Sequence, residues 1–147
     1  MSPDRGKRAK ATRTKGSRAK APVRAAEQLP GPGASYVARW HPAADAERDA
    51  SWPAGEKVAM LNAVQKLEAV GPRLGHPHSS AVQGEAGKGF RELRPRAGRS
   101  RWRPIYRQVT AETFVIFAVG PEAQIDGRGF DAAAERAVAR FADFEVD

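Results

Sequence analysis

Three short segments between Gly89 and Gly120 limit what this chain can fold into. Each is six to eight residues long, rich in β-branched or aromatic side chains, and bounded by turn-forming residues. This pattern is typical of three consecutive strands that form an antiparallel meander. The third segment, 113–120, is apolar at nearly every position, so we expect a central strand that is covered on both faces.

The first two of these segments carry an unusual density of arginine. Residues 91–107 hold seven arginines and one acid, a net charge of +6. A sheet that displays so many guanidinium groups indicates a binding face for a polyanion. The arginines are Arg91, Arg94, Arg96, Arg99, Arg101, Arg103 and Arg107.

Positive charge is also concentrated at the beginning of the chain. The protein has 147 residues and a formal net charge of +8, and residues 1–34 contain nine Lys or Arg against two acids, which accounts for +7 of that total. Because this segment has few large apolar side chains, it cannot bury enough surface to offset the entropy cost of ordering. We therefore expect a disordered basic arm and linker over 1–34, followed by one folded domain over 35–147. The arm is either a nucleic-acid-binding tail or dispensable.

The remaining elements follow from hydrophobic periodicity. Alternation over 35–40 predicts a first strand, an Ala-rich stretch over 43–50 predicts a short helix, and 51–70 predicts a longer one. Asp131 is expected to cap a last helix over 132–144. The predicted fold is therefore α+β in the order β-α-α-β-β-β-α, with an antiparallel sheet and helices packed on one of its faces.

The longer helix is expected to contribute to the core. Val58, Leu61, Val64 and Leu67 recur at helical spacing and form an apolar stripe. The Gly71-Pro72 pair is expected to end the helix. We interpret the stripe as core rather than as a binding surface.

Several classes of site are excluded or disfavoured by what the sequence lacks. The absence of cysteine excludes disulfides, zinc–thiolate sites and a cysteine nucleophile. No apolar run approaches the roughly 18 residues that a membrane span needs, and the N-terminus has no apolar core of the kind found in signal peptides. A cytoplasmic protein is therefore expected. His76 and His78 have no obvious third partner ligand, so we expect no metal site.

Three motifs follow one another in an order and spacing known from one family. The loop 71–78 reads Gly-Pro-Arg-Leu-Gly-His-Pro-His, residues 90–94 read Phe-Arg-Glu-Leu-Arg, and residues 102–106 read Trp-Arg-Pro-Ile-Tyr. Together they resemble the RelE/ParE toxin superfamily, in particular its phage-derived, HigB-like branch. The similarity extends from about Tyr36 to Phe144.

This resemblance implies the toxin of a type II toxin–antitoxin system, which pairs with an antitoxin protein. HigB-like members are endoribonucleases that cleave mRNA on the translating ribosome without a metal ion or another cofactor. In that reaction the 2′-hydroxyl attacks the adjacent phosphate and the 5′-oxygen leaves. Fixed guanidinium groups stabilise the phosphorane, because they present paired donors to phosphate oxygens, and a His, Glu or Tyr side chain transfers protons.

The resemblance also implies roles for individual residues. The residues that match the catalytic positions of the family are Glu92, Arg94, Arg103, Tyr106 and His78. Among them, Arg103 is expected to face the phosphate, and Phe90, Glu92 and Arg94 are expected to point the same way along one strand. The residues expected to bind RNA are Arg91, Arg96, Arg99, Arg101, Arg107 and Arg128.

Structural roles stay open for several of these residues. Glu92 can pair with Arg94 or Arg103 and tie neighbouring strands together. Tyr106 can be a packed aromatic ring with a hydrated hydroxyl, and His78 can order its own loop through hydrogen bonds. Each of these alternatives competes with a catalytic role for the same residue.

The chain departs from the family pattern after the third strand of the meander. There the family usually has an aromatic residue and two lysines, whereas residues 119–124 read Val-Gly-Pro-Glu-Ala-Gln, and Glu122 brings a negative charge. Arg128 can replace the lost cations only in part. The loss of one such donor costs on the order of 10²–10³ in rate.

Two alternatives to an active ribonuclease therefore stay open. One is a catalytically weakened or inactive relative that binds RNA, the ribosome or an antitoxin partner. The other is a ParE-like gyrase inhibitor, which the shared fold allows.

Overall fold

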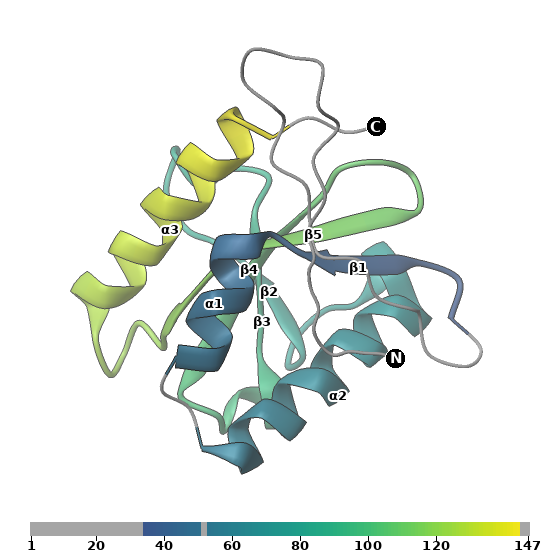
Figure 1. The fold of residues 1–147 in the computed structure, drawn as a ribbon, viewed down its shortest axis with the longest axis horizontal. Coiled ribbons are helices and arrows are strands. Elements are labelled where there is room, and N and C mark those ends of the chain that lie inside the picture. Colours follow the sequence, from purple (N-terminus) through teal and green to yellow (C-terminus); the bar gives the residue numbers. More distant parts are fainter. Residues whose placement is uncertain (1–33, 51–52, 145–147) are drawn as a thin grey trace.

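The computed structural model describes residues 34–50 and 53–144, and these form a mixed α+β fold (Figure 1). This part of the chain contains a five-stranded sheet and three α-helices. The basic arm expected over 1–34 lies outside the described residues, apart from Ala34. None of the described helices is both long and apolar enough to cross a membrane.

The chain follows the predicted order of elements with one addition, the short strand β2. Its Ser-Ser-Ala sequence has no periodicity that separates it from the surrounding loop. The elements are β1 (Val37–Trp40), α1 (Pro42–Ala50), α2 (Ala54–Val70), the 3-10 turn η1 (Gly71–Arg73), β2 (Ser79–Ala81), β3 (Arg91–Leu93), the turn η2 (Pro95–Gly98), β4 (Trp102–Gln108), β5 (Thr113–Pro121) and α3 (Gly127–Ala142).

The strands lie in the order β1-β5-β4-β3-β2. The pairs from β5 through β2 are antiparallel, but β1 runs parallel to β5. The prediction of a purely antiparallel sheet is therefore wrong at β1, where the long connection between the two strands permits parallel pairing. β5 lies between β1 and β4, and its residues 114–120 are buried, which confirms the prediction of a covered central strand.

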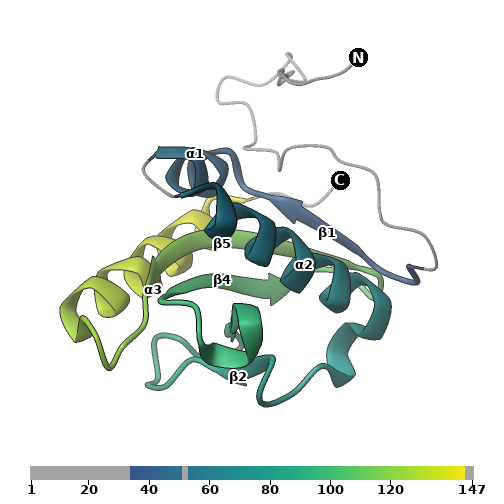
Figure 2. The same ribbon diagram turned by 90° about the horizontal axis from the view of Figure 1, so that it is seen from below.

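The helices cover both faces of the sheet (Figure 1 and Figure 2), so the prediction that they pack on one face is wrong. In β5, Phe114 and Ile116 pack toward α2, whereas Val115 and Phe117 pack toward α3. This follows from the alternation of side chains along a strand. Because β5 is apolar at every one of these positions, each face needs its own cover.

The buried face of α2 differs from the predicted stripe. Val58 and Leu61 are 57% and 50% exposed, so the stripe is wrong at its first two positions. The helix instead buries Met60, Val64 and Leu67, which have the spacing i, i+4, i+7 of one helical face. Val58 and Leu61 are left as an apolar surface near the start of the helix.

The last helix begins earlier than its sequence indicates. Asp126 precedes α3, and its carboxylate accepts a hydrogen bond from the Gly129 N–H at 2.9 Å. Asp131, the predicted cap, lies exposed within the helix. The glycines at 127 and 129 concealed this start, because glycine is a poor helix former.

A cluster of charged side chains completes one edge of β5. β1 pairs with β5 only as far as Ile116, so the next backbone groups of β5 need other partners. Glu47 of α1 accepts a hydrogen bond from the Val119 N–H at 3.0 Å. Arg136 and Arg140 of α3 donate to the carbonyls of Val119 and Phe117 and pair with Glu47 at 2.9 and 2.8 Å. The cluster therefore joins α1 and α3 to the central strand.

His41 lies beside this cluster and caps α1. Its side chain is buried, and Nδ1 accepts a hydrogen bond from the Ala43 N–H at 3.1 Å. The pKa of His41 is lowered to about 4, first by burial and then by the positive charge of Arg140, against the opposing effect of Glu47. The folded protein therefore keeps His41 neutral well below the pH at which a free histidine takes up a proton.

We expect the free energy of unfolding to decrease as the pH falls from about 6.5 to 4. Over this range the unfolded chain binds a proton at His41 that the folded chain does not, so the contribution is complete above the unfolded pKa and is lost on acidification. Its size is at most about 3 kcal/mol. His41→Asn retains a capping oxygen but does not titrate, so denaturation measured across this pH range should give a flatter profile. Identical profiles for the variant and the wild type would contradict this role of His41.

Candidate functional site

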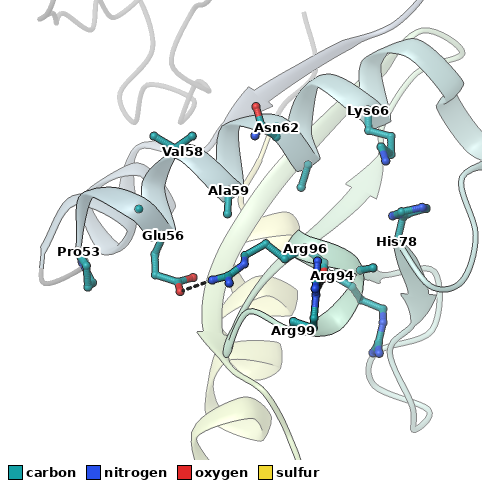
Figure 3. Close-up of a pocket in the computed structure, with 13 residues that line it drawn as sticks. Pro53, Glu56, Val58, Ala59, Asn62, Lys66, His78, Arg94, Arg96 and Arg99 are labelled. Atoms are coloured by element: carbon teal, nitrogen blue, oxygen red, sulfur yellow. Dashed lines mark hydrogen bonds and ion pairs between the residues drawn. The ribbon is translucent and has the colours of Figure 1, made fainter.

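A pocket of about 690 Å³ lies between α2 and the segment that joins β3 to β4 (Figure 3). Residues from Pro53 to Lys66 form one wall, and the opposite wall consists of His78, Arg94, Arg96, Ala97 and Arg99. A volume of this size is typical of sites that bind small ligands or single residues of a polymer.

The pocket is strongly cationic. Lys66, Arg94, Arg96 and Arg99 contribute four positive charges and Glu56 one negative charge, which gives a formal net charge of +3 with His78 neutral. Figure 3 shows the three arginines opposite α2, with Lys66 and His78 at one end and Glu56 toward the other. Glu56 Oε2 lies 3.5 Å from Arg96 NH1. Four cations therefore line one pocket, and one of them, Arg96, is paired with a carboxylate there.

The α2 wall is largely apolar. Pro53, Ala59 and Ala63 line it opposite the guanidinium groups, whereas the Val58 side chain projects from the other side of the helix (Figure 3). The pocket thus offers an apolar surface on one side and hydrogen-bond donors on the other. A nucleotide has matching parts, since its base presents a flat face and its phosphate accepts paired hydrogen bonds.

Local backbone structure fixes the position of Arg94 at the wall of this pocket. β3 ends at Leu93, and Arg94 adopts φ −121° and ψ 79°. Its N–H donates to the His78 carbonyl at 2.9 Å, and its Nε donates to the Pro77 carbonyl at 3.0 Å. Arg94 therefore does not follow Phe90, which lies in the α3-facing core, and is instead held next to His78.

Arg103 lies elsewhere and is fully buried. Its guanidinium NH2 donates to Glu122 at 2.9 Å, and its Nε lies 3.2 Å from Glu92 Oε1. Burial lowers the pKa of Arg103, Glu92 and Glu122 raise it, and the charge of Arg94 lowers it further. The expectation that Arg103 faces a phosphate does not agree with this position. Of the two roles considered for Glu92, pairing with Arg103 is the one that this geometry displays.

Tyr106 is also enclosed. It is 2% exposed, and its hydroxyl lies 2.6 Å from Ser79 Oγ. The same Ser79 oxygen accepts a hydrogen bond from Arg91 Nε at 2.9 Å. Tyr106 and Arg91 thus connect β4, β2 and β3 across the sheet and do not line the pocket.

The other predicted RNA-binding arginines are dispersed. Arg107 lies over the rings of Phe90 and Phe141, at 5.0 and 4.4 Å from their centroids, and donates to the Lys88 carbonyl. Arg101 and Arg128 are exposed but do not line the pocket. The seven arginines of the meander therefore do not form a single surface.

The sequence interpretation missed the contribution of α2 to this site. Lys66 and Glu56 lie off the predicted apolar stripe, and the sequence pattern assigned neither of them a functional role. Their role depends on where the β3–β4 segment packs, and no local sequence signal carries that information. Within residues 34–50 and 53–144, no three His, Asp or Glu side chains are grouped as a metal ion would require.

Fold and pocket together define a small α+β protein with a cationic, nucleotide-sized site. Residues 50–120 match the family model described as phage derived protein Gp49-like (DUF891), a family of RelE-like toxins of type II toxin–antitoxin systems. The matched segment contains every residue that lines the pocket. No curated protein was found to match the sequence.

The enclosed position of Tyr106 can be tested by Tyr106→Phe. This change leaves the Ser79 hydroxyl without one buried partner, so we expect stability to fall by about 1–2 kcal/mol. The affinity for RNA that the sequence predicts should stay the same, because the hydroxyl does not reach the pocket. Urea denaturation and RNA titration measure the two effects separately. A large loss of RNA affinity with unchanged stability would indicate that Tyr106 contributes to RNA binding.

Proposed function

We propose that this chain is a type II toxin and that it binds and cleaves mRNA at the pocket between α2 and η2. The observation that carries the proposal is a pocket lined by four cations and by apolar residues of α2, within the segment that matches the Gp49-like family. We further propose that the chain belongs to the HigB-like branch, because its three motifs resemble those of that branch.

RNA binding follows from the composition of the two walls. Arg94, Arg96 and Arg99 can each present two N–H donors to phosphate oxygens, and Lys66 adds a point charge. Ala59 and Ala63 offer an apolar surface for the face of a base. The segment bound is single-stranded, because only an unpaired base can reach such a surface.

Cleavage needs proton transfer in addition to binding. As the 2′-oxygen forms its bond to phosphorus, a base must take the hydroxyl proton, and as the bond to the 5′-oxygen breaks, an acid must supply one. His78 is the titratable group beside Arg94 and is our candidate for one of these roles. The guanidinium groups would stabilise the charge that accumulates on the phosphorane.

Arg99→Ala should weaken binding to a single-stranded RNA and reduce the slope of log affinity against log salt concentration by about 0.7–1. Arg73→Ala, which removes an exposed arginine outside the pocket, is the matched control and should change neither quantity. The N-terminal arm is present in both variants, so its contribution cancels. Equal losses in the two variants would show that RNA is held by overall charge.

Induced expression of the wild type should arrest growth and produce discrete mRNA ends. His78→Ala should abolish those ends while the purified variant still binds RNA. Mapping mRNA ends after expression measures this directly. Ends that persist in His78→Ala would remove His78 from the proton-transfer step.

A second candidate function is RNA binding without cleavage. The specific observation in its favour is that Glu92, Arg103 and Tyr106, which match catalytic positions of the family, are committed to contacts inside the protein. The same two experiments separate the candidates, since a binder without activity retains the salt-dependent affinity and produces no mRNA ends.

We also propose that an antitoxin covers the pocket with an acidic, amphipathic segment. Val58 and Leu61 are exposed on α2, the helix that forms one wall of the pocket. Leu61→Ser should therefore weaken binding of the proposed antitoxin, as measured by titration calorimetry. Ile125→Ser removes an equally exposed apolar residue elsewhere and should have no effect. Equal affinities for both variants would place the partner on another surface.

A further inference from the structure

The turn that carries Arg96 and Arg99 has an unusual backbone. Arg96 and Ala97 adopt left-handed conformations, with φ of 58° and 56°, and Gly98 follows with φ of 94°. Only glycine adopts this region without a steric cost, and each other residue pays about 1–2 kcal/mol. A turn with two such residues in succession needs support from its surroundings.

Arg103 supplies support from beneath the turn. Its guanidinium NH2 donates to the Gly98 carbonyl at 3.2 Å, and its NH1 donates to the Ser100 carbonyl. These hydrogen bonds satisfy two carbonyls of the segment that carries Arg96 and Arg99. A guanidinium can do this because its donors lie in one plane with fixed spacing.

Two carboxylates hold Arg103 in this position. Glu122, just after β5, accepts from NH2 at 2.9 Å, and Glu92 of β3 lies 3.2 Å from Nε. A buried guanidinium without such partners would be unstable. Glu122 is the residue that brings negative charge where the family usually has lysine. Its place beside Arg103 gives that departure a physical reason.

Contacts from α2 fix the opposite side of the same turn. Glu56 accepts a hydrogen bond from the Ser100 hydroxyl and pairs with Arg96 at 3.5 Å. The Ser100 Oγ also accepts from the Trp102 N–H at 3.3 Å. The turn is thus held between Glu56 above and Arg103 below.

We propose that Arg103 and Glu122 are positioning residues, which hold the left-handed turn so that Arg96 and Arg99 face the pocket. This inference rests on the proposed function, because it assigns the turn to the binding of RNA phosphates. Arg103 itself acts from inside the protein and does not touch the RNA.

The test is Glu122→Gln in the full chain, with binding measured to a labelled, single-stranded oligoribonucleotide. Removal of a negative charge should by itself strengthen binding to a polyanion. Loss of positioning should weaken it, by about tenfold if one charge-assisted hydrogen bond to phosphate is lost. Glu112→Gln removes an exposed carboxylate at the β4–β5 turn and is the charge-matched control, with unchanged or slightly stronger binding.

Combining Glu122→Gln with Arg99→Ala tests the route of the effect. If Glu122 acts through the turn, the double variant should bind about as weakly as the weaker of the single variants. The N–H groups of Gly98 and Ser100 are hydrogen-bonded within this segment. Their amide hydrogen exchange should therefore be faster in Glu122→Gln than in the wild type. If Glu122→Gln does not fold, Arg103→Lys is measured in the same way.

The outcomes distinguish this inference from the proposed function. If Arg99→Ala binds RNA as tightly as the wild type does, the proposed function is overturned. Faster amide exchange in Glu122→Gln would still support the role of Arg103 in holding the turn. Binding that weakens in Arg99→Ala but is equal or stronger in Glu122→Gln, with unchanged amide exchange, would overturn the positioning role alone.

Discussion

A buried guanidinium needs carboxylate and carbonyl partners, and this requirement organises much of the molecule. Arg103 is surrounded by Glu92, Glu122 and the carbonyls of the η2 segment. At the other edge of the central strand β5, Glu47 forms ion pairs with Arg136 and Arg140. Acidic residues are used here as internal connectors between elements that are far apart in sequence. Arg94, Arg96 and Arg99 line the pocket, and in the described part of the chain the ion pair found within this group is that of Arg96 with Glu56. These arginines therefore remain available to a ligand.

Features of the fold that depend on local composition can be predicted from the sequence. The continuous apolar run of β5 predicted a central, covered strand, because no other environment accommodates apolar side chains on both faces. The stop of α2 at Gly71 was likewise predictable from its chemistry. These features depend on local composition alone.

Other features depend on tertiary contacts that leave little trace in the sequence. The parallel pairing of β1 with β5 is decided by packing. The cap at Asp126 is local, but the glycines that follow it conceal the start of the helix. Four residues that the sequence suggested for catalysis or RNA binding line one pocket, namely His78, Arg94, Arg96 and Arg99. Lys66 was missed, and Arg103 was expected in the wrong surroundings. The sequence does not indicate which of the seven arginines is buried. Burial of Arg103 depends on its pairing with Glu122, which lies 19 residues further along the chain.

The edge of the sheet formed by β1 limits how another protein can associate with this one. Glu68 is buried, and its carboxylate accepts a hydrogen bond from the Ala38 N–H of β1 at 3.0 Å. An incoming strand that extends the sheet past β1 would have to displace this carboxylate from the Ala38 N–H. Growth of the sheet at that margin is therefore energetically disfavoured, and association through side-chain surfaces is the less costly route.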